Sequence, residues 1–365
     1  MSAATHRVLR RLAPDARGRT RVEVAEVPTP RLAPGDALLA PAVAGICGTD
    51  WQILRGLRPD ASPVLGHEGV ARLVEPGDSG LPAGSLVTVN PTHPDDPSFL
   101  LGHNLPGLWA ERTRIPAAAV RAGLVLPVPD GADRPRVAAL AEPLASVLYG
   151  LRTALRTTRP AALVVWGDGI VGRLAREAWQ RELPGLPTLL VGHGPEAVHP
   201  LDRGLPQALA ALPSPVAAVI ATPRTGTREA LSAVDRHVRG TLLVDVHAGL
   251  PSGRVPLSAG GIEVAALRAD NCGGRPWPPR VHRFDRPAGP LLLHGHRGVS
   301  GEHLRQAVGL LMAQGGEAPL GAEVLTHEVD LAGAADLVNS LLASGGRIAD
   351  GRRVLKAAIR IGGRP

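Results

Sequence analysis

The residues best suited to chemistry are a cysteine, a histidine and carboxylates in the first 142 residues. Cys47 lies in GICGTD, His67 and Glu68 lie in VLGHEGV, and Glu142 lies in LAEPL. Thiolate, imidazole and carboxylate are the ligand types that zinc takes in proteins, and three protein ligands with one open position are typical of a catalytic site. Taken singly, Cys47 is compatible with core packing and His67 with a turn. Their combination indicates a zinc site.

A glycine-rich segment predicts a dinucleotide site. VVWGDGIVG places Gly167, Gly169 and Gly172 in G-x-G-x-x-G spacing, after a buried-strand run and before a helical pattern. In that context the first glycine permits a tight turn, the second lets a pyrophosphate approach the backbone, and the third lets the helix pack on the strand. The helix start, at Ile170 and Val171, offers N–H groups to the phosphates. We therefore expect NAD or NADP as cofactor.

The strands that follow this segment are expected to complete the cofactor site. NAD-specific sites usually have an acid at the end of the second strand. Here Gly192, His193 and Gly194 occupy that position, which removes a repulsion against a 2′-phosphate and inclines the prediction toward NADP, with NAD left open. The residues expected to line the nicotinamide ring at later strand ends are Ala221, Thr222, Val246, His247 and Gly295.

The order of apolar patterns predicts two kinds of architecture. The first 130 residues read as short strands separated by Gly/Pro turns, as in a small barrel. From about residue 136 a helical pattern interrupted by Pro143 leads into alternating buried strands and helices, which is typical of a parallel sheet covered on both faces. The chain ends in two helical patterns and a strand-like run. Residues 268–288 are irregular and carry no assignment.

Composition excludes several functional classes. Hydrophobic residues make up 44% of the chain and charged residues 20%, as in globular proteins. The net charge of +7 is almost all arginine, and aromatic residues at 2% are too few to stack on nucleic acid. We expect no nucleic-acid partner and, without a long apolar run, no membrane span. Two cysteines and no apolar leader predict a cytoplasmic protein without a disulfide framework.

The motifs together resemble the medium-chain dehydrogenase/reductase superfamily, in its zinc-dependent alcohol and polyol (sorbitol, cyclitol) dehydrogenase branch. The matching segments, in chain order, are GICGTD, GHEGVARLVEPG, GLWAERTRIPA, LAEPLASVLYGL and WGDGIVG. The resemblance implies an α/β protein with a GroES-like β-barrel catalytic domain over 1–150 and 297–365. A doubly wound Rossmann dinucleotide-binding domain over 151–296 is inserted between them. It also implies a small-molecule alcohol or ketone substrate and a homodimer or homotetramer.

The same resemblance assigns roles to single residues. Cys47, His67 and Glu142 are similar to the catalytic zinc ligands, and Glu68 to a carboxylate that enters or leaves the metal shell. Thr49 resembles the hydroxyl residue that passes on the substrate's proton. The sequence departs from the pattern at Gln52, where many relatives have a relay histidine, and between residues 90 and 107, which lack the four cysteines of a second, structural zinc. One zinc per chain is therefore expected.

The expected reaction is hydride transfer between a secondary alcohol, of polyol, sugar or aminocyclitol type, and a nicotinamide cofactor. Two alternatives stay open. One is a zinc-free reductase of the same superfamily that acts on a C=C or quinone bond. The other is a non-catalytic nucleotide-binding protein that senses redox state.

Overall fold

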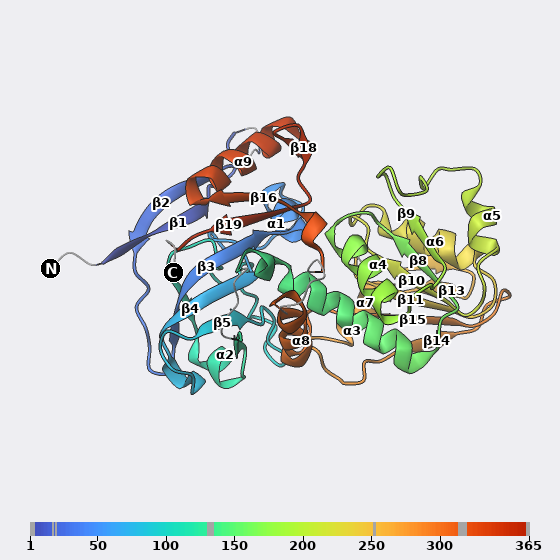
Figure 1. Cartoon of the computed structure of the whole chain (residues 1–365), viewed down its shortest axis with the longest axis horizontal. Helices are drawn as coiled ribbons and strands as arrows, with labels where there is room; N and C mark the ends of the chain where they lie inside the picture. The colour runs from blue at the N-terminus through green and yellow to red at the C-terminus, as the bar shows by residue number, and fades with distance from the viewer. Residues whose placement is uncertain are drawn as a thin grey trace. The chain divides into compact units, whose positions relative to one another are not determined.

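The computed structural model describes residues 4–16, 18, 20–129, 135–250, 253–312 and 320–362. These residues form two compact units, which Figure 1 shows with the elements labelled. The first unit combines the described residues up to Glu142 with those from Leu304 onward, and the second runs from Pro143 to His303. Both divisions fall inside helices, α3 (Ala141–Thr157) and α8 (Gly301–Met312).

The first unit is built on a seven-stranded sheet whose strands come from both ends of the chain. The strand order is β16-β19-β3-β4-β5-β7, and β6 also pairs with β3. The strands are β3 (Ala37–Ile46), β4 (Gly69–Glu75), β5 (Leu86–Val89), β6 (Thr113–Ile115), β7 (Val125–Pro127), β16 (Leu325–Asp330) and β19 (Lys356–Arg360). Strand β19 pairs antiparallel with β3, with Ala357 opposite Ile46. Strands from near residue 40 and near residue 358 are therefore neighbours in one sheet.

Smaller elements close this unit around its core. A hairpin of β1 (Thr5–Arg11) and β2 (Val22–Pro28) is covered by α9 (Leu331–Ser344). The side-chain amide of Asn339 in α9 donates to the backbone carbonyl of Val22 and accepts from its N–H. Trp109 and Leu39 are among the fully buried side chains. The remaining elements are α1 (Gly48–Leu54), α2 (Ala117–Arg121), β17 (Ile348–Ala349), β18 (Arg352–Arg353) and the 3₁₀ turns η1 (Gly77–Ser79), η2 (Pro135–Leu140) and η3 (Ala322–Val324).

The second unit is a doubly wound sheet in the order β14-β15-β11-β10-β8-β9, parallel except for β14. Its strands are β8 (Ala162–Trp166), β9 (Thr188–Val191), β10 (Val216–Ile220), β11 (Leu242–Val246), β14 (His282–Phe284) and β15 (Leu291–Gly295). Its other elements are α4 (Ile170–Glu182), α5 (Leu205–Ala210), α6 (Thr227–His237), α7 (Val264–Ala269) and the hairpin β12 (Val255–Leu257) and β13 (Gly260–Ile262). These two units confirm the predicted fold class.

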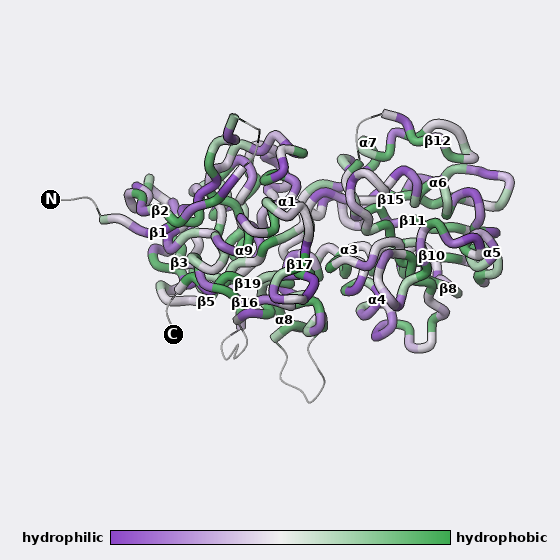
Figure 2. Tube along the Cα trace, turned by 90° about the horizontal axis from the view of Figure 1, so that it is seen from above, coloured by the Kyte–Doolittle hydropathy of each residue, from purple (hydrophilic) through white to green (hydrophobic). Residues whose placement is uncertain are grey.

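The central parallel strands β8, β10 and β11 are buried on both faces, as uninterrupted apolar runs predict. In Figure 2 the tube near the labels β8 and β10 is mostly green, the colour of hydrophobic residues. Alternate strand residues, such as Val164, Ala218 and Val244, form one cluster with α5 and α6. Their neighbours on β11 and β15, including Asp245 and His294, face the opposite side of the sheet.

The structure corrects two expectations and lacks one strand of the usual Rossmann order. Pro143 does not interrupt a helix: it lies in the first turn of α3, where a missing N–H costs no hydrogen bond. Residues 268–288 are not wholly irregular, since they end α7 and contain the antiparallel edge strand β14. In the six-stranded Rossmann order a third strand pairs beyond the second one. Here α5 is the only helix or strand of the described residues between β9 and β10, so that third strand is missing and β9 lies at the edge of the sheet. Among the described residues, the structure has no helix with the length and apolarity needed to cross a membrane.

Candidate metal centre and dinucleotide site

The first turn of α1 fixes the predicted cysteine ligand. Cys47 Sγ accepts the backbone N–H of Thr49 (3.2 Å) and of Asp50 (3.4 Å), while the Asp50 carboxylate accepts the N–H of Cys47 at 2.8 Å. This is a capping box in which cysteine takes the place usually held by Ser or Thr. The segment C-G-T-D thereby holds a buried thiol in one direction at the helix start.

The thiol faces the predicted histidine. Cys47 Sγ lies 3.7 Å from His67 Nε2. Two groups of potential ligands meet at His67, one with Cys47 and Asp50 and the other with Glu68 and Glu142. Within each group the ligand atoms lie within 4.8 Å of one another. The structure thus brings the four sequence-predicted ligands together through His67 and adds Asp50, although Cys47 and Glu142 do not share one such group.

The electrostatics of this centre suit a cation. Burial raises the pKa of the Cys47 thiol well above its usual range, and the charge of Asp50 raises it further. Asp50 Oδ1 and His67 Nδ1 are buried without a hydrogen-bond partner, an arrangement that costs free energy unless something compensates. A divalent cation would favour the thiolate and neutralise neighbouring carboxylates. Thiol, imidazole and carboxylate donors therefore fit zinc here.

One carboxylate of the centre already has a cationic partner. Glu68 pairs with the ammonium of Lys356, the only lysine of the chain, which β19 brings in from 288 positions away. Both side chains are buried, and burial lowers the pKa of Lys356 to about 8. A Cβ at Gly45 would lie 2.8 Å from the lysine Nζ, so the close approach of the pair depends on that glycine. Lys356 thus restrains Glu68 beside His67.

The polar loop 91–107 is largely occupied with its own hydrogen bonds. His93 Nδ1 accepts the N–H groups of Asp95 and Asp96 at 3.1 and 2.9 Å. His103 is different, because its ring lies 4.8 Å from that of His67 and its Nδ1 contacts Asp60 at 3.0 Å.

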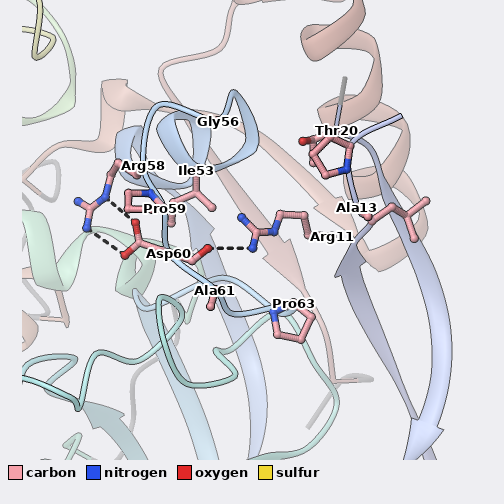
Figure 3. A pocket seen from close by; sticks show the side chains of 12 residues that line it. Arg11, Ala13, Thr20, Ile53, Gly56, Arg58, Pro59, Asp60, Ala61 and Pro63 are labelled. Carbon is pink, nitrogen blue, oxygen red and sulfur yellow. Dashed lines mark hydrogen bonds and ion pairs between the residues drawn. The ribbon is translucent and has the colours of Figure 1, made fainter. Parts of the chain in front are cut away.

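Asp60 in turn borders a pocket of about 440 Å³ on the first unit (Figure 3). Arg58 binds the Asp60 carboxylate through two nitrogens, and Arg11 donates to the Asp60 backbone carbonyl at 2.8 Å. Although burial alone would raise it, the hydrogen bonds from His103 and Arg58 hold the pKa of Asp60 below its usual range. Thr49 and Gln52 are half-buried in α1.

The glycine motif forms the turn between β8 and α4 in the second unit. Gly167 has a φ of 123°, and a Cβ there would lie 2.4 Å from the carbonyl oxygen of Ala221. A Cβ at Gly172 would lie 1.8 Å from the carbonyl oxygen of Gly167, so helix and strand pack through this glycine. Gly169, the N-cap of α4, faces open space. The first and third glycines therefore serve the fold, and the second leaves room before Ile170 and Val171.

An acid does lie at the tip of β9, and it comes from the glycine loop. The Asp168 side chain is buried, and its Oδ2 would lie 2.7 Å from a Cβ at Gly194 and its Oδ1 3.2 Å from one at Gly192. The absence of an acid in the strand sequence was therefore misleading about the charge at this position. Arg173 donates to the Asp168 backbone carbonyl at 3.0 Å and helps to fix the loop.

The other predicted cofactor contacts occupy strand ends of the same unit. His193 is exposed and lies 3.1 Å from His199, measured between ring nitrogens. Thr222, which follows β10, shares a 3.0 Å hydrogen bond with the hydroxyl of Thr227. Val246 is fully buried as the last residue of β11. Contact of these residues with a cofactor stays a prediction.

A sheet that takes strands from two distant parts of the chain, and a doubly wound parallel sheet formed by the sequence that separates those parts, match the fold class of the medium-chain dehydrogenases. Residues 33–130 match the family of the alcohol dehydrogenase GroES-like domain. A putative zinc-binding dehydrogenase from Sinorhizobium meliloti, solved with NADP, superposes with a TM-score of 0.68 at 19% identity, over 98% of this chain and 99% of that one.

Curated relatives agree over a shorter span. Glucose 1-dehydrogenase of Thermoproteus tenax is 30% identical over 172 residues, and an uncharacterized zinc-type alcohol dehydrogenase-like protein of Haemophilus influenzae is 32% identical over 174. These matches cover 41% and 42% of this chain, which spans about half the length (48%) of each relative. The matched domain and these relatives agree with the resemblance to the medium-chain dehydrogenase/reductase superfamily that the motifs predicted, over the parts of the chain that they cover.

Proposed function

We propose that this protein is a zinc-dependent oxidoreductase that transfers hydride between a secondary alcohol and NAD or NADP. The observation that carries the proposal is the meeting of Cys47, Asp50, Glu68 and Glu142 at His67 in a buried, anionic centre. Two similar proteins also support the proposal: the zinc-type alcohol dehydrogenase-like protein of Haemophilus influenzae and the Sinorhizobium meliloti dehydrogenase solved with NADP. A reductase without zinc would have no use for a buried thiol, imidazole and carboxylate in this arrangement.

In this proposal Cys47, His67 and Glu142 hold the metal, and Lys356 restrains Glu68 at its edge. A zinc ion there supplies Lewis acidity, which lowers the pKa of an alcohol hydroxyl. The Thr49 hydroxyl, two residues after Cys47 in the first turn of α1, would receive the substrate's proton. With Gln52 in place of a relay histidine, the proton passes on to water. The phosphate loop and the ends of β10 and β11 bind the dinucleotide and orient its nicotinamide ring.

Metal content and hydride transfer test this function together. We expect elemental analysis of the purified full chain to give one zinc per chain. We also expect NAD(P)-linked oxidation of a panel of polyols, sugars and aminocyclitols to exceed that of ethanol, because a carboxylate ligand favours oxygen-rich substrates. Zinc near zero, with no recovery on adding the metal, would favour a zinc-free reductase. Bound zinc and dinucleotide without any hydride transfer would favour a sensor.

We also propose that Asp168 makes the cofactor NAD rather than NADP. A carboxylate at the tip of the second strand hydrogen-bonds a ribose 2′-hydroxyl and repels a 2′-phosphate. We expect kcat/KM for NAD to exceed that for NADP at least tenfold, and Asp168→Ser to reduce this ratio by about tenfold. Glu196→Gln is the matched control, because Glu196 is an exposed acid in the segment that follows β9 and pairs with Arg176 instead. A wild-type preference for NADP would contradict this assignment.

A further inference from the structure

One face of α1 leads from the candidate metal centre to the surface of the first unit. Residues four positions apart lie on the same face of a helix, so Cys47, Trp51 and Arg55 form one stripe along α1. Cys47 and Trp51 are buried, whereas Arg55 is exposed. Trp51 lies roughly 6 Å along the helix from Cys47, at the usual rise per residue. The stripe therefore begins at a candidate metal ligand and ends at solvent.

The segment that follows α9 crosses this stripe within the same unit. Arg55 donates to the backbone carbonyl of Gly345, the C-cap of α9, at 3.4 Å. Two residues later the Arg347 guanidinium lies over the Trp51 ring, with its Cζ 5.8 Å from the ring centroid. A cation over the face of an indole is attracted by the ring, which favours this position of the guanidinium. A positive charge is thereby placed about one helical turn from Cys47.

The charge of Arg347 has no anionic partner in the part of the chain that the structure describes. Its guanidinium forms no ion pair and no hydrogen bond with these residues. Burial lowers the pKa of Arg347, and the charges of Arg55 and Arg353 lower it further, while the charge of Cys47 opposes this effect. Like charges that face one another repel, and an anion placed between them removes that cost. The arrangement is therefore incomplete without an anion.

These three arginines, here named the arginine cluster (Arg55, Arg347 and Arg353), are open to solvent. Arg55 and Arg353 are exposed, and Arg347 is half-buried, so a ligand can reach them from the surface of the unit. A guanidinium donates in a planar fork that matches the oxygens of phosphates and carboxylates. A phosphate monoester carries about −1.5 to −2 charges at neutral pH. The excess of positive charge therefore favours a phosphate over a singly charged carboxylate.

The position of the arginine cluster relates it to the substrate of the proposed reaction. A substrate hydroxyl at the metal centre lies beside Cys47, and the rest of the molecule extends away from that centre. Arg347 lies over Trp51, about one turn of α1 further along the same stripe. A short carbon chain spans such a distance. The arginine cluster can therefore hold an anionic group at the far end of a polyol or sugar whose hydroxyl reacts at the metal.

We propose that the arginine cluster binds a phosphate monoester group of the substrate, so that the protein acts on a phosphorylated polyol or sugar. Arg347 is the main contact, because it lies over Trp51 nearest to the metal centre and has no other partner. Arg55 and Arg353 add positive charge from the exposed side. The inference rests on the proposed dehydrogenase function and names the substrate class of the same site.

Paired substrates that differ only in the phosphate test the proposal. The probes are sorbitol and sorbitol 6-phosphate, with gluconate as a carboxylate of similar length. We expect wild-type kcat/KM to be about 30-fold higher for the phosphate ester than for sorbitol, mainly through KM, because charge-assisted hydrogen bonds are the strong ones. Arg347→Gln should lower this ratio to about 3, and Arg347→Lys, which retains the charge without the fork, should give an intermediate ratio. Arg55→Gln, at an exposed position, should lower it about threefold.

Arg352→Gln is the matched control. Arg352 is an exposed arginine beside Arg353 on β18, and successive side chains of a strand point to opposite faces. The ratio of kcat/KM for the phosphate ester and for sorbitol should not change in this variant. An equal fall of the ratio in Arg352→Gln and Arg347→Gln would mean that general surface charge attracts the ester, and would overturn the arginine cluster as a site.

Binding titrations with the full chain separate this inference from the dehydrogenase function. We expect Arg347→Gln to weaken binding of sorbitol 6-phosphate about tenfold, with NADH affinity unchanged. Such binding in a protein that transfers no hydride would support the cluster and overturn the dehydrogenase. Hydride transfer at equal kcat/KM for sorbitol and its phosphate ester, or a stronger preference for gluconate, would overturn the phosphate site alone. An equal loss of NADH affinity in Arg347→Gln would assign the cluster to the pyrophosphate of the dinucleotide and overturn the proposal.

Discussion

Gly169→Val is expected to abolish dinucleotide binding while the protein remains folded. Gly169 does not have a left-handed φ, and a Cβ added there has no atom within 4 Å. The valine side chain would instead fill the approach to the first N–H groups of α4, where a pyrophosphate binds. We expect the dissociation constant for NADH to rise about 100-fold or more, with zinc content and the melting temperature unchanged.

Valine substitutions at two other glycines serve as controls for this experiment. Gly309→Val places the same side chain in open space on the exposed face of α8, and NADH affinity should not change. Gly172→Val forces a Cβ to within 1.8 Å of a carbonyl oxygen and should destabilise the second unit instead. Unchanged NADH affinity in a folded Gly169→Val protein would place the dinucleotide elsewhere.

Cys47→Ser is expected to remove zinc and activity without unfolding the barrel. Serine is a preferred N-cap residue and can accept the same N–H groups of Thr49 and Asp50, so α1 retains its start. It does not replace a thiolate as a zinc ligand. Activity should fall by more than about 100-fold, since even changes outside the ligand shell cost 10–100-fold. Cys47→Ala should lose the metal and, in addition, about 1 kcal/mol of stability from the cap.

Controls separate the metal from the thiol. Cys272→Ala removes the other cysteine, a half-buried residue of the second unit, and should leave zinc content and turnover unchanged. NADH binding should survive in Cys47→Ser, because the glycine motif lies in the other unit. A Cys47→Ser protein with most of its activity would show that Cys47 serves only to cap α1.

The parts of the fold that the sequence predicts well are those with local signals. Apolar runs such as 162–166 and 216–220 have no polar interruption, and each is a buried parallel strand. The glycine motif lies at the expected strand–helix turn, since tight turns and close packing restrict which residues fit. Residues 268–288 lacked such a signal, because β14 is a short edge strand in a proline-rich segment.

The missed residues of the candidate sites depend on contacts between distant segments. Lys356 reaches Glu68 only because β19 pairs with β3, and nothing near Lys356 in the sequence indicates a carboxylate partner. Asp168 supplies the acid that the end of β9 lacks, which becomes visible only when the loop is folded over Gly192.

Arg347 meets Trp51 through the packing of the segment after α9 on α1, not through any spacing in the sequence. Asp50 had a local signal, the capping box C-G-T-D, which could have identified it beside Cys47.

The enclosed Lys356 gives the protein an unusual response to chemical labelling. Its amine is the only lysine amine of the chain, and its side chain is fully buried. Reagents that acylate lysine therefore have no target of that kind on the folded surface and can react at Lys356 only after β19 separates from its neighbours. The rate of acylation at Lys356 would measure how often the barrel opens at the strand that closes it.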